Sequence, residues 1–274
     1  MPLIQIASID DPRLDDYRNI PDPDLLASRD IFIAEGRLVV RRLLDSPRFT
    51  TRSLLVTPGA RASLGDLDQR IATLPVYLVH QDAMDAITGF NIHRGCLAVG
   101  ERGSPTDWRQ VAGAARTVIA LERVANPDNI GSIFRNAAAF GARAVLLGPA
   151  CADPLYRKSI RTSMGAALLV PFATMTAWPG DLLWLRTSGF TLVALTPSAD
   201  AAPLANCVRN LGPDPRVALL LGHEGWGLSD EAMAAADVRA FIPMSPGTDS
   251  LNMATAAAVA LYELARLKSV GSGQ

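Results

Sequence analysis

The sequence is poor in cysteine, and the three cysteines that it contains are far apart. Cys96, Cys151 and Cys207 are odd in number, which argues against a disulfide framework, and no Cys or His falls at metal-ligand spacing. We therefore expect no metal ion. We interpret the thiols as small buried apolar groups in a reducing compartment, which predicts a cytoplasmic protein.

Long apolar runs are also absent. A membrane-spanning helix needs about 20 apolar residues, and the most apolar stretch, Met253–Leu264, is shorter and contains Glu263. Residues Met1–Asp11 lack the basic start and apolar core of a signal peptide. These absences predict a soluble protein with no membrane partner.

A strong charge of either sign is missing, since the formal net charge is -1 and Lys158 and Lys268 are the only lysines. A protein that binds nucleic acid over most of its surface is usually basic. Any RNA-binding surface must therefore be local. The dinucleotide-binding pattern G-x-G-x-x-G does not follow the first strand of either predicted domain, which disfavours a dinucleotide-dependent enzyme.

With 274 residues, 49% hydrophobic and 19% charged, the chain has the composition of a globular protein and room for two domains. The stretch from Gly103 to Asp107 has no helix or strand pattern and reads as a linker. We place a small domain at residues 1–103, a linker at 104–115 and a second domain at 116–274.

Short apolar runs alternate with amphipathic segments in both predicted domains. In the first domain the expected strands are Ile31–Ile33, Ser53–Thr57, Val76–Val79 and Cys96–Gly100. In the second they are Thr117–Leu121, Ala144–Leu147, Thr191–Leu195, Val217–Leu221 and Val238–Ile242. Nearly continuous apolar strands separated by helices indicate an α/β fold with a mainly parallel sheet.

Three polar segments follow strands of the second domain, where parallel sheets bind ligands. In the first segment, Asp128 or Asn129 is expected to cap a helix that runs to Phe140 and ends at Gly141. Arg135 lies on this helix among residues suited to packing, and its guanidinium could bind a phosphate.

The second segment follows the strand that ends at Leu221 and contains Gly222, Gly225 and Gly227. These glycines indicate backbone that turns tightly or approaches a ligand closely, although a glycine-rich turn before a helix is the simpler interpretation. Glu224 favours a functional loop. The role of His223 stays open.

The third segment, Ile242–Asn252, leads into the last helix, which we expect to run from about Asn252 to Lys268. Ser250 and Asn252 are both candidate helix caps. Capping is compatible with catalysis here, because a helix N-terminus offers free N–H groups to a phosphate.

In this order and spacing, the three segments resemble the motifs of the SpoU (TrmH-type) branch of the SPOUT class of RNA methyltransferases, most clearly from Thr117 to Arg266. Phe32–Gly36 and Gly95–Val99 resemble the small α/β RNA-substrate-binding domain that often precedes that fold. The resemblance implies a trefoil-knotted C-terminal domain, bound S-adenosylmethionine, and a homodimer that pairs through the knotted domain. It also implies that each active site draws on both subunits.

The resemblance assigns roles to particular positions. Those matching the family's catalytic and structural polar residues are Asn129, Arg135, Glu224, Ser250 and Asn252. Those matching its cofactor contacts are Thr196, Gly222, Ile242, Met244 and Leu251.

The implied reaction is methylation of a ribose 2'-hydroxyl in RNA, with rRNA favoured over tRNA because of the added N-terminal domain. The residue that matches Arg135 is the family's proposed general base. A guanidinium has a pKa above ~12, so anchoring the adjacent phosphate is the alternative role.

Two questions stay open at this point. Arg157, Lys158 and Arg161 lie close together and form either a phosphate-binding patch or a solvated basic helix face. A non-catalytic RNA-binding protein that retains the fold is the alternative to the enzyme.

Overall fold

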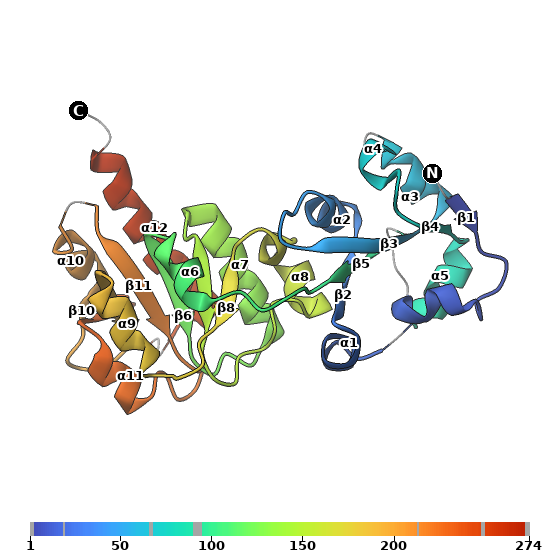
Figure 1. Cartoon of the computed structure of the whole chain (residues 1–274). Coiled ribbons are helices and arrows are strands. Elements are labelled where there is room, and N and C mark those ends of the chain that lie inside the picture. The colour runs from blue at the N-terminus through green and yellow to red at the C-terminus, as the bar shows by residue number, and fades with distance from the viewer. Residues whose placement is uncertain are drawn as a thin grey trace. The chain divides into compact units, whose positions relative to one another are not determined.

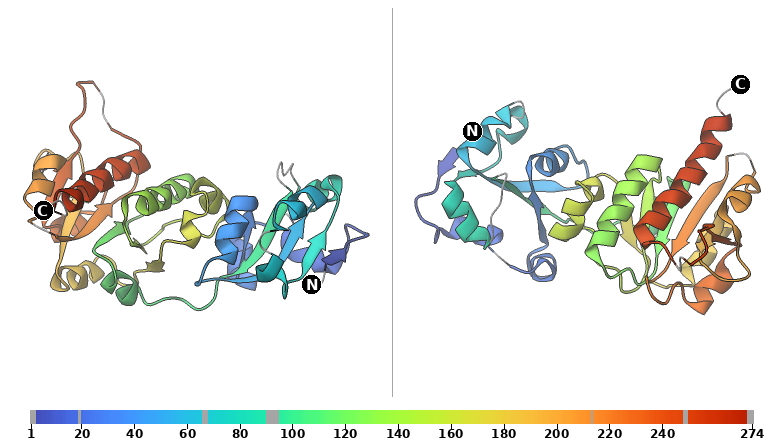
Figure 2. Two further views of the ribbon diagram at one scale, coloured as in Figure 1. Left: turned by 90° about the horizontal axis from the view of Figure 1, so that it is seen from above. Right: turned by 180° about the vertical axis from the view of Figure 1, so that it is seen from behind.

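The chain forms two compact units in the computed structural model, which describes residues 3–18, 20–65, 68–89, 95–212, 214–247 and 250–271 (Figures 1 and 2). Unit 1 comprises Met1–Ser104 and Pro154–Leu169. Unit 2 comprises Pro105–Asp153 and Val170–Gln274.

Unit 1 is built on a five-stranded sheet in the order β1-β4-β3-β5-β2. The strands are β1 (Leu3–Gln5), β2 (Ile31–Glu35), β3 (Thr50–Val56), β4 (Val76–Leu78) and β5 (Cys96–Glu101). The helices are α1 (Asp22–Arg29), α2 (Arg37–Leu44), α3 (Pro58–Ala62), α4 (Asp68–Ile71), α5 (Gln81–Thr88) and α8 (Arg157–Thr162), with 3-10 turns η1 (Pro12–Tyr17) and η3 (Ala166–Leu168). The four strands predicted for this region are present, and β1 is an additional one.

One face of this sheet packs against a hydrophobic cluster in which Leu14, Tyr17 and Met84 join strand residues such as Leu55. The Tyr17 hydroxyl lies 2.7 Å from the Ser53 hydroxyl, and burial raises the pKa of this phenol. The hydrogen bond satisfies two buried polar groups inside an apolar core.

Residues 154–169 differ from expectation, since the sequence predicts them in the C-terminal domain and the structure assigns them to unit 1. The reason is an ion pair between two residues that are far apart in the sequence, Arg157 and Asp22. The Arg157 side chain donates through Nε to Asp22 at 2.7 Å, and Ile160 on the same helix is buried. No local pattern could reveal this pairing across the chain.

Unit 2 contains a seven-stranded sheet in the order β10-β12-β9-β11-β6-β7-β8. The strands are β6 (Thr117–Leu121), β7 (Ala144–Leu147), β8 (Phe172–Thr174), β9 (Phe190–Leu195), β10 (Ala202–Pro203), β11 (Arg216–Leu221) and β12 (Val238–Phe241). The helices are α6 (Trp108–Gly113), α7 (Pro127–Phe140), α9 (Asp181–Thr187), α10 (Leu204–Arg209), α11 (Asp230–Ala235) and α12 (Met253–Gly271). Every pairing described in this sheet is parallel, as predicted.

Helices cover both faces of this sheet, which is why its central strands are apolar throughout. Figure 1 shows α6 and α9 on one face, and the view from behind in Figure 2 shows α7 and α12 on the other. On the first face the rings of Trp108 and Trp184 meet edge to face at 5.1 Å. On the second, Asn136 of α7 donates to the Ala254 carbonyl of α12 at 2.8 Å.

The stretch predicted as a linker, 104–115, contains α6 instead of irregular chain. The Asp107 side chain caps this helix by accepting from the Arg109 N–H at 3.0 Å. Trp108 and Val111 then enter the core of unit 2, so the helix is held by apolar burial as well as by its cap.

Candidate functional site

The chain order in the sheet of unit 2 changes direction between β6 and β11, which lie side by side. In parallel sheets this is where ligands bind, beyond the carboxyl ends of the strands. A cavity of about 990 Å³ lies beside this point, beyond the carboxyl ends of β11, β9 and β12. It is lined by segments that follow β9, β11 and β12 and by the start of α12: residues 195–198, 221–228, 233, 241–242, 244–247, 250–253 and 256.

All five residues expected to contact a cofactor line this cavity. They are Thr196, Gly222, Ile242, Met244 and Leu251. Glu224, Ser250 and Asn252, which the sequence assigned to polar roles, line it as well. Three segments that are far apart in the sequence therefore meet at one place, while the assignment of roles stays a prediction.

A chain of side-chain hydrogen bonds ties helix α7 to the two loops that follow β11 and β12. The Asn129 amide on α7 donates to the Glu224 carboxylate, and the Asn252 amide donates to the Asn129 side-chain oxygen at 3.0 Å. Asn129 is only 5% exposed, so its polar groups need these partners. Both ends of the Asn129 amide are thereby used, and the network fixes its orientation.

Asn252 extends this hydrogen-bond network to the last helix, α12. Its side-chain oxygen accepts from the backbone N–H groups of Ala254 and Thr255, at 2.9 and 3.2 Å. Of the two candidate caps, Asn252 therefore caps α12. Ser250 is exposed at the cavity and is available for another contact.

The predicted cap of α7 is wrong, because the residue that caps this helix is Asn126. Its side-chain oxygen accepts from the Asp128 N–H at 2.9 Å, and Pro127 occupies the first turn. Proline suits that position, since its missing N–H would have no helical partner there. The cap at Asn126 leaves the Asn129 side chain free for the network.

Gly222 is a position that only glycine can occupy. A Cβ atom there would lie 2.2 Å from the Gly227 carbonyl carbon and 2.2 Å from the Leu228 nitrogen. His223 and Gly227 exchange two backbone hydrogen bonds of 2.9 Å, which close the loop tightly against itself. The glycine pattern thus reflects close backbone packing beside the cavity.

Glu122 is a site residue that the sequence did not single out. It is 1% exposed at the end of β6, and its carboxylate accepts from the Ser229 N–H at 2.9 Å. Ser229 caps α11, so Glu122 anchors the far end of the Gly222 loop to β6. A carboxylate placed directly after a fully buried strand was the available signal.

His223 and Trp226 form an aromatic pair on the same loop. The backbone N–H groups of Gly225 and Trp226 donate to Nδ1 of His223, at 2.8 and 3.3 Å. The two rings are stacked with centroids 4.3 Å apart and planes 17° apart. Trp226 is 80% exposed, and both residues line the cavity.

Of the predicted catalytic residues, Arg135 is the one that the single chain does not place beside Asn129, Glu224, Ser250 and Asn252. It lies on the exposed side of α7 and, among the described residues, is not part of the cavity lining. The reason is helical geometry. Arg135 follows the buried Asn129 by six residues, which turns its side chain by about 240° around the helix axis and away from the network.

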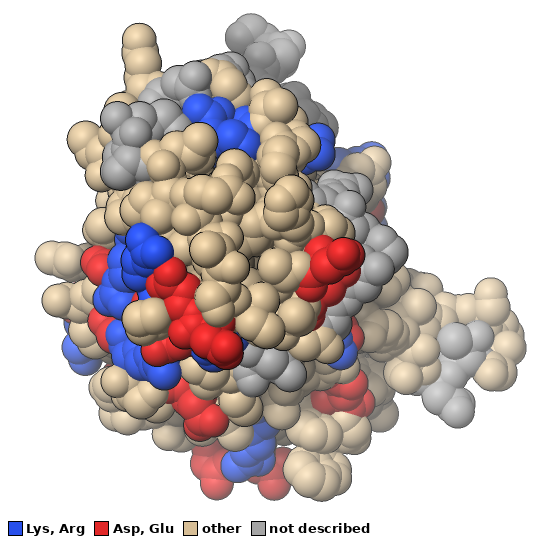
Figure 3. Space-filling view, turned by 90° about the vertical axis from the view of Figure 1, so that its right-hand side faces the viewer, with Lys and Arg blue, Asp and Glu red and all other residues tan. Residues whose placement is uncertain are grey.

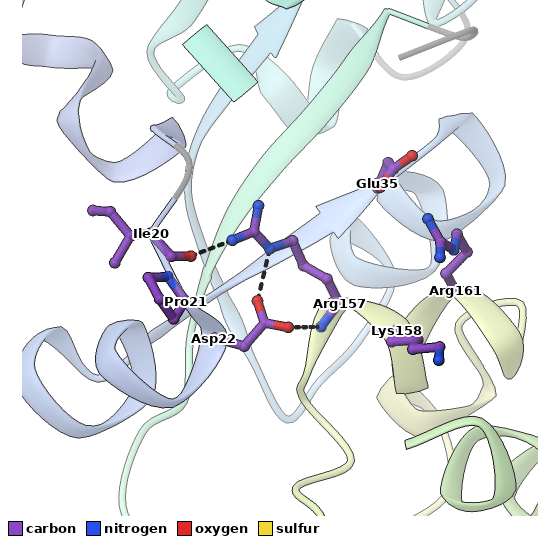
Figure 4. Close-up of a pocket in the computed structure, with 7 residues that line it drawn as sticks. All are labelled: Ile20, Pro21, Asp22, Glu35, Arg157, Lys158 and Arg161. Atoms are coloured by element: carbon purple, nitrogen blue, oxygen red, sulfur yellow. Dashed lines mark hydrogen bonds and ion pairs between the residues drawn. The ribbon is translucent and has the colours of Figure 1, made fainter. Parts of the chain in front are cut away.

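A smaller pocket of about 360 Å³ lies in unit 1 and contains the predicted basic cluster (Figure 4). Arg157 turns toward Asp22 and the Ile20 carbonyl and away from Arg161. The Asp22 carboxylate also accepts from the Arg157 N–H at 2.8 Å. Arg157 is therefore neutralised within unit 1, while Lys158 and Arg161 are exposed and share the pocket with Glu35.

Outside this pocket, the surface carries basic and acidic side chains side by side (Figure 3). On the face shown in Figure 3, Lys and Arg side chains lie among Asp and Glu and do not merge into one broad positive area. In the described part of the chain, no group of three or more His, Cys, Asp or Glu could hold a metal ion. No described helix is long and apolar enough to cross a membrane.

Comparison with protein families gives a match over the second half of the chain. A model described as the SpoU rRNA methylase family matches residues 116–262. This range contains all three polar segments and the whole of the seven-stranded sheet.

Two relatives match over nearly the full length. The chain is 48% identical to an uncharacterized tRNA/rRNA methyltransferase of Mycobacterium tuberculosis, over 95% of this chain and 91% of that one. It is 26% identical to RlmP of Bacillus subtilis, a 23S rRNA (guanosine(2553)-2'-O)-methyltransferase, over 95% of this chain and 98% of that one.

The fold also matches a solved structure. The crystal structure of an AdoMet-bound rRNA methyltransferase from Sinorhizobium meliloti aligns with a TM-score of 0.81 and 26% identity. The alignment covers 96% of this chain and 98% of that one, so the likeness extends through both units.

Proposed function

Because the chain belongs to the SpoU rRNA methylase family, we propose that it methylates a ribose 2'-hydroxyl in RNA, with S-adenosylmethionine as the methyl donor. The observation that carries this proposal is the hydrogen-bonded chain Glu224–Asn129–Asn252, which joins α7 to two separate segments that line the cavity. Names of relatives support rRNA as the substrate over tRNA, since RlmP is a 23S rRNA 2'-O-methyltransferase.

The cavity suits the methyl donor in size and chemistry. Its volume of about 990 Å³ can hold a nucleoside-sized ligand, and binding pockets commonly measure ~300–1,000 Å³. Met244 and Leu251 are both 37% exposed, so they offer apolar surface there. Gly222 admits close backbone approach, and the Thr196 hydroxyl, which accepts from the Ser198 N–H at 3.2 Å, adds a polar group.

S-adenosylmethionine would supply an electrophilic methyl group, and the residues of this chain would position the ribose that receives it. A 2'-hydroxyl is a poor nucleophile until its proton is removed or shared. Ser250 and Asn252 would hold the ribose by hydrogen bonds, with Asn252 fixed by Asn129 and by α12. Fixed orientation of the reacting groups lowers the entropic part of the barrier.

The cation for this reaction would come from a second copy of the chain. The described part of the cavity lining includes Glu224 but no lysine or arginine, whereas Arg135 is exposed on α7. Ala138 and Ala139 are exposed beside it and would let a partner helix approach closely. We therefore propose a homodimer, paired through a trefoil-knotted C-terminal domain, in which Arg135 anchors the substrate phosphate of the partner's site.

Unit 1 would bind the RNA substrate outside the reacting nucleotide. Free thiols at Cys96, Cys151 and Cys207 fit the reducing cytoplasm in which RNA is modified.

The test is transfer of labelled methyl from S-adenosylmethionine to deproteinised RNA from cells that lack this protein. We expect label in rRNA at one position, where the methylated ribose resists alkaline cleavage. Calorimetry with S-adenosylmethionine accompanies it. A folded protein that binds RNA but shows neither cofactor binding nor transfer would be a non-catalytic RNA-binding protein, and the proposal would be wrong.

A further inference from the structure

Trp226 is unlike the other tryptophans of this chain. Trp108 is 3% exposed, and Trp178 and Trp184 pack partly buried against the same core of unit 2. Trp226 is 80% exposed at the tip of the loop between β11 and α11. Tryptophan is enriched among the residues that contribute most to binding energy, which makes an exposed indole beside a cavity a candidate contact.

The Trp226 ring is held in place, although it is exposed. His223 stacks on it at 4.3 Å, and Nδ1 of His223 accepts two backbone N–H groups of the loop, including that of Trp226. The loop is closed beneath by the paired hydrogen bonds of His223 and Gly227. Ordering this ring before a ligand arrives reduces the entropy lost on binding.

The surroundings of the ring offer little electrostatic attraction for RNA. Among the described residues of the cavity lining, Glu224 is the one Asp, Glu, Lys or Arg, and it is acidic. Phosphate contacts normally supply most of the affinity of a protein for nucleic acid. Apart from the phosphate contact proposed for the second copy, a substrate at this cavity therefore gains affinity from a contact that does not depend on charge, and base stacking on an aromatic ring is such a contact.

We propose that Trp226, backed by His223, is a stacking surface for an unpaired nucleobase of the RNA substrate, at or next to the modified nucleotide. This inference rests on the proposed function, because it assigns the substrate contact of the same cavity. It assigns His223 a positioning role, since His223 acts through the indole and not on the reacting atoms.

The first experiment compares methyl-transfer kinetics of Trp226→Ala and Trp226→Phe with the unchanged enzyme. Stacking is worth ~1–3 kcal/mol per base, so we expect the KM for RNA to rise about 5- to 150-fold in Trp226→Ala. Trp226→Phe should recover most of this loss, and kcat should stay within about 3-fold. Leu183→Ala is the matched control, because Leu183 is 64% exposed on α9 and is not part of the cavity lining.

His223→Ala tests the positioning role. It should raise the KM for RNA less than Trp226→Ala does, and it should have no further effect when added to Trp226→Ala. Additive effects of the two changes would contradict the claim that His223 acts through the indole.

The second experiment measures binding without turnover. The emission of Trp226, taken as the difference between the unchanged protein and Trp226→Phe, should be quenched by single-stranded RNA oligonucleotides and unchanged by S-adenosylmethionine alone. Quenching by the cofactor alone, with weaker cofactor binding in Trp226→Ala, would assign the ring to the cofactor's adenine and overturn the proposal. Loss of a dimer in sedimentation of Trp226→Ala would assign it to a subunit interface, with the same consequence.

The outcomes also separate this inference from the proposed function. RNA-dependent quenching of Trp226 without any methyl transfer would leave the stacking surface standing and remove the enzymatic assignment. Methyl transfer by Trp226→Ala with an unchanged KM for RNA would support the enzymatic assignment and overturn the stacking surface. The variant should fold, because substitutions of exposed residues usually change stability by less than ~0.5 kcal/mol.

Discussion

The two units each contain a cavity, and the cavities are built on different interactions. The cavity of unit 2 measures about 990 Å³, and its polar groups are ordered by an amide chain that runs from Glu224 through Asn129 to Asn252. The pocket of unit 1 measures about 360 Å³, and five of its seven lining residues are charged. Hydrogen-bonded amides fix geometry, whereas solvent-exposed charges attract a polyanion and weaken with salt. This difference fits the proposed function, in which unit 2 would perform the chemistry and unit 1 would add affinity for RNA.

The largest expected effect is that of Arg135→Ala, because the described residues that line the cavity of unit 2 include no lysine or arginine. We expect kcat to fall about 100- to 1,000-fold, as when one charge-stabilising group is removed, with cofactor affinity unchanged. The measurements are single-turnover methyl transfer and calorimetry. Arg143→Ala, another exposed arginine of unit 2, serves as the control.

Subunit mixing then tests where Arg135 acts. Arg135→Ala mixed with inactive Asn252→Ala should regain about a quarter of the full activity, because half of the dimers are mixed and each has one intact site. If no activity returns in mixtures shown to exchange subunits, Arg135 does not complete the partner's site.

The next effect is that of Gly222→Ala, which tests whether the cavity of unit 2 depends on close backbone packing. The added Cβ would meet backbone atoms of Gly227 and Leu228 at 2.2 Å, so we expect a loss of about 3 kcal/mol in unfolding free energy. Gly225→Ala is the matched control in the same loop, since its nearest neighbour is a His223 ring atom at 3.6 Å. Urea denaturation measures both, and equal stability of the two variants would contradict the explanation.

A smaller effect, dependent on pH, is expected for Asn129→Asp. This isosteric change places a second carboxylate opposite that of Glu224. We expect the unfolding free energy, measured by urea denaturation, to fall by about 2 kcal/mol at pH 7.5. Facing carboxylates bind a proton more readily than separate ones, so the loss should shrink as the pH falls toward 5. Asn206→Asp, on the surface of α10 beside Arg209, should show neither the loss nor the pH dependence.

The smallest effect concerns the pocket of unit 1. The double change Lys158→Ala with Arg161→Ala should weaken RNA binding. The slope of the logarithm of the binding constant against the logarithm of the salt concentration should become shallower by about 2, because two fewer phosphates would be neutralised. Arg13→Ala with Arg18→Ala removes the same charge from unit 1 outside the pocket and is the control. Equal salt dependence of the two double variants would favour a solvated helix face.

Much of unit 2 could be predicted because its strands are buried on both faces. Val217–Leu221 forms an unbroken apolar run, and β11 lies there as expected. The two-residue edge strand β10 (Ala202–Pro203) is too short to produce such a signal. The three polar segments could be placed together for the same reason, since they follow strands of one parallel sheet.

Features that depend on contacts distant in sequence could not be predicted. Nothing near Arg157 indicates that its partner is Asp22, and so nothing assigns residues 154–169 to unit 1. The stacking of Trp226 on His223 depends on a loop closure that the glycine pattern permits but does not specify. The cap of α7 was within reach, because Pro127 after Asn126 favours Asn126 as the cap.

The return of residues 154–169 to unit 1 has a consequence for dissecting this protein. A single cut near Ser104 cannot release unit 1, because α8 and η3 enter the sequence between strands β7 and β8 of the other unit. A fragment that starts after Ser104 would carry orphaned apolar side chains at Ile160 and Leu168 that normally lie inside unit 1. Such a fragment should aggregate, and swapping unit 1 between related proteins would require two splices in each chain.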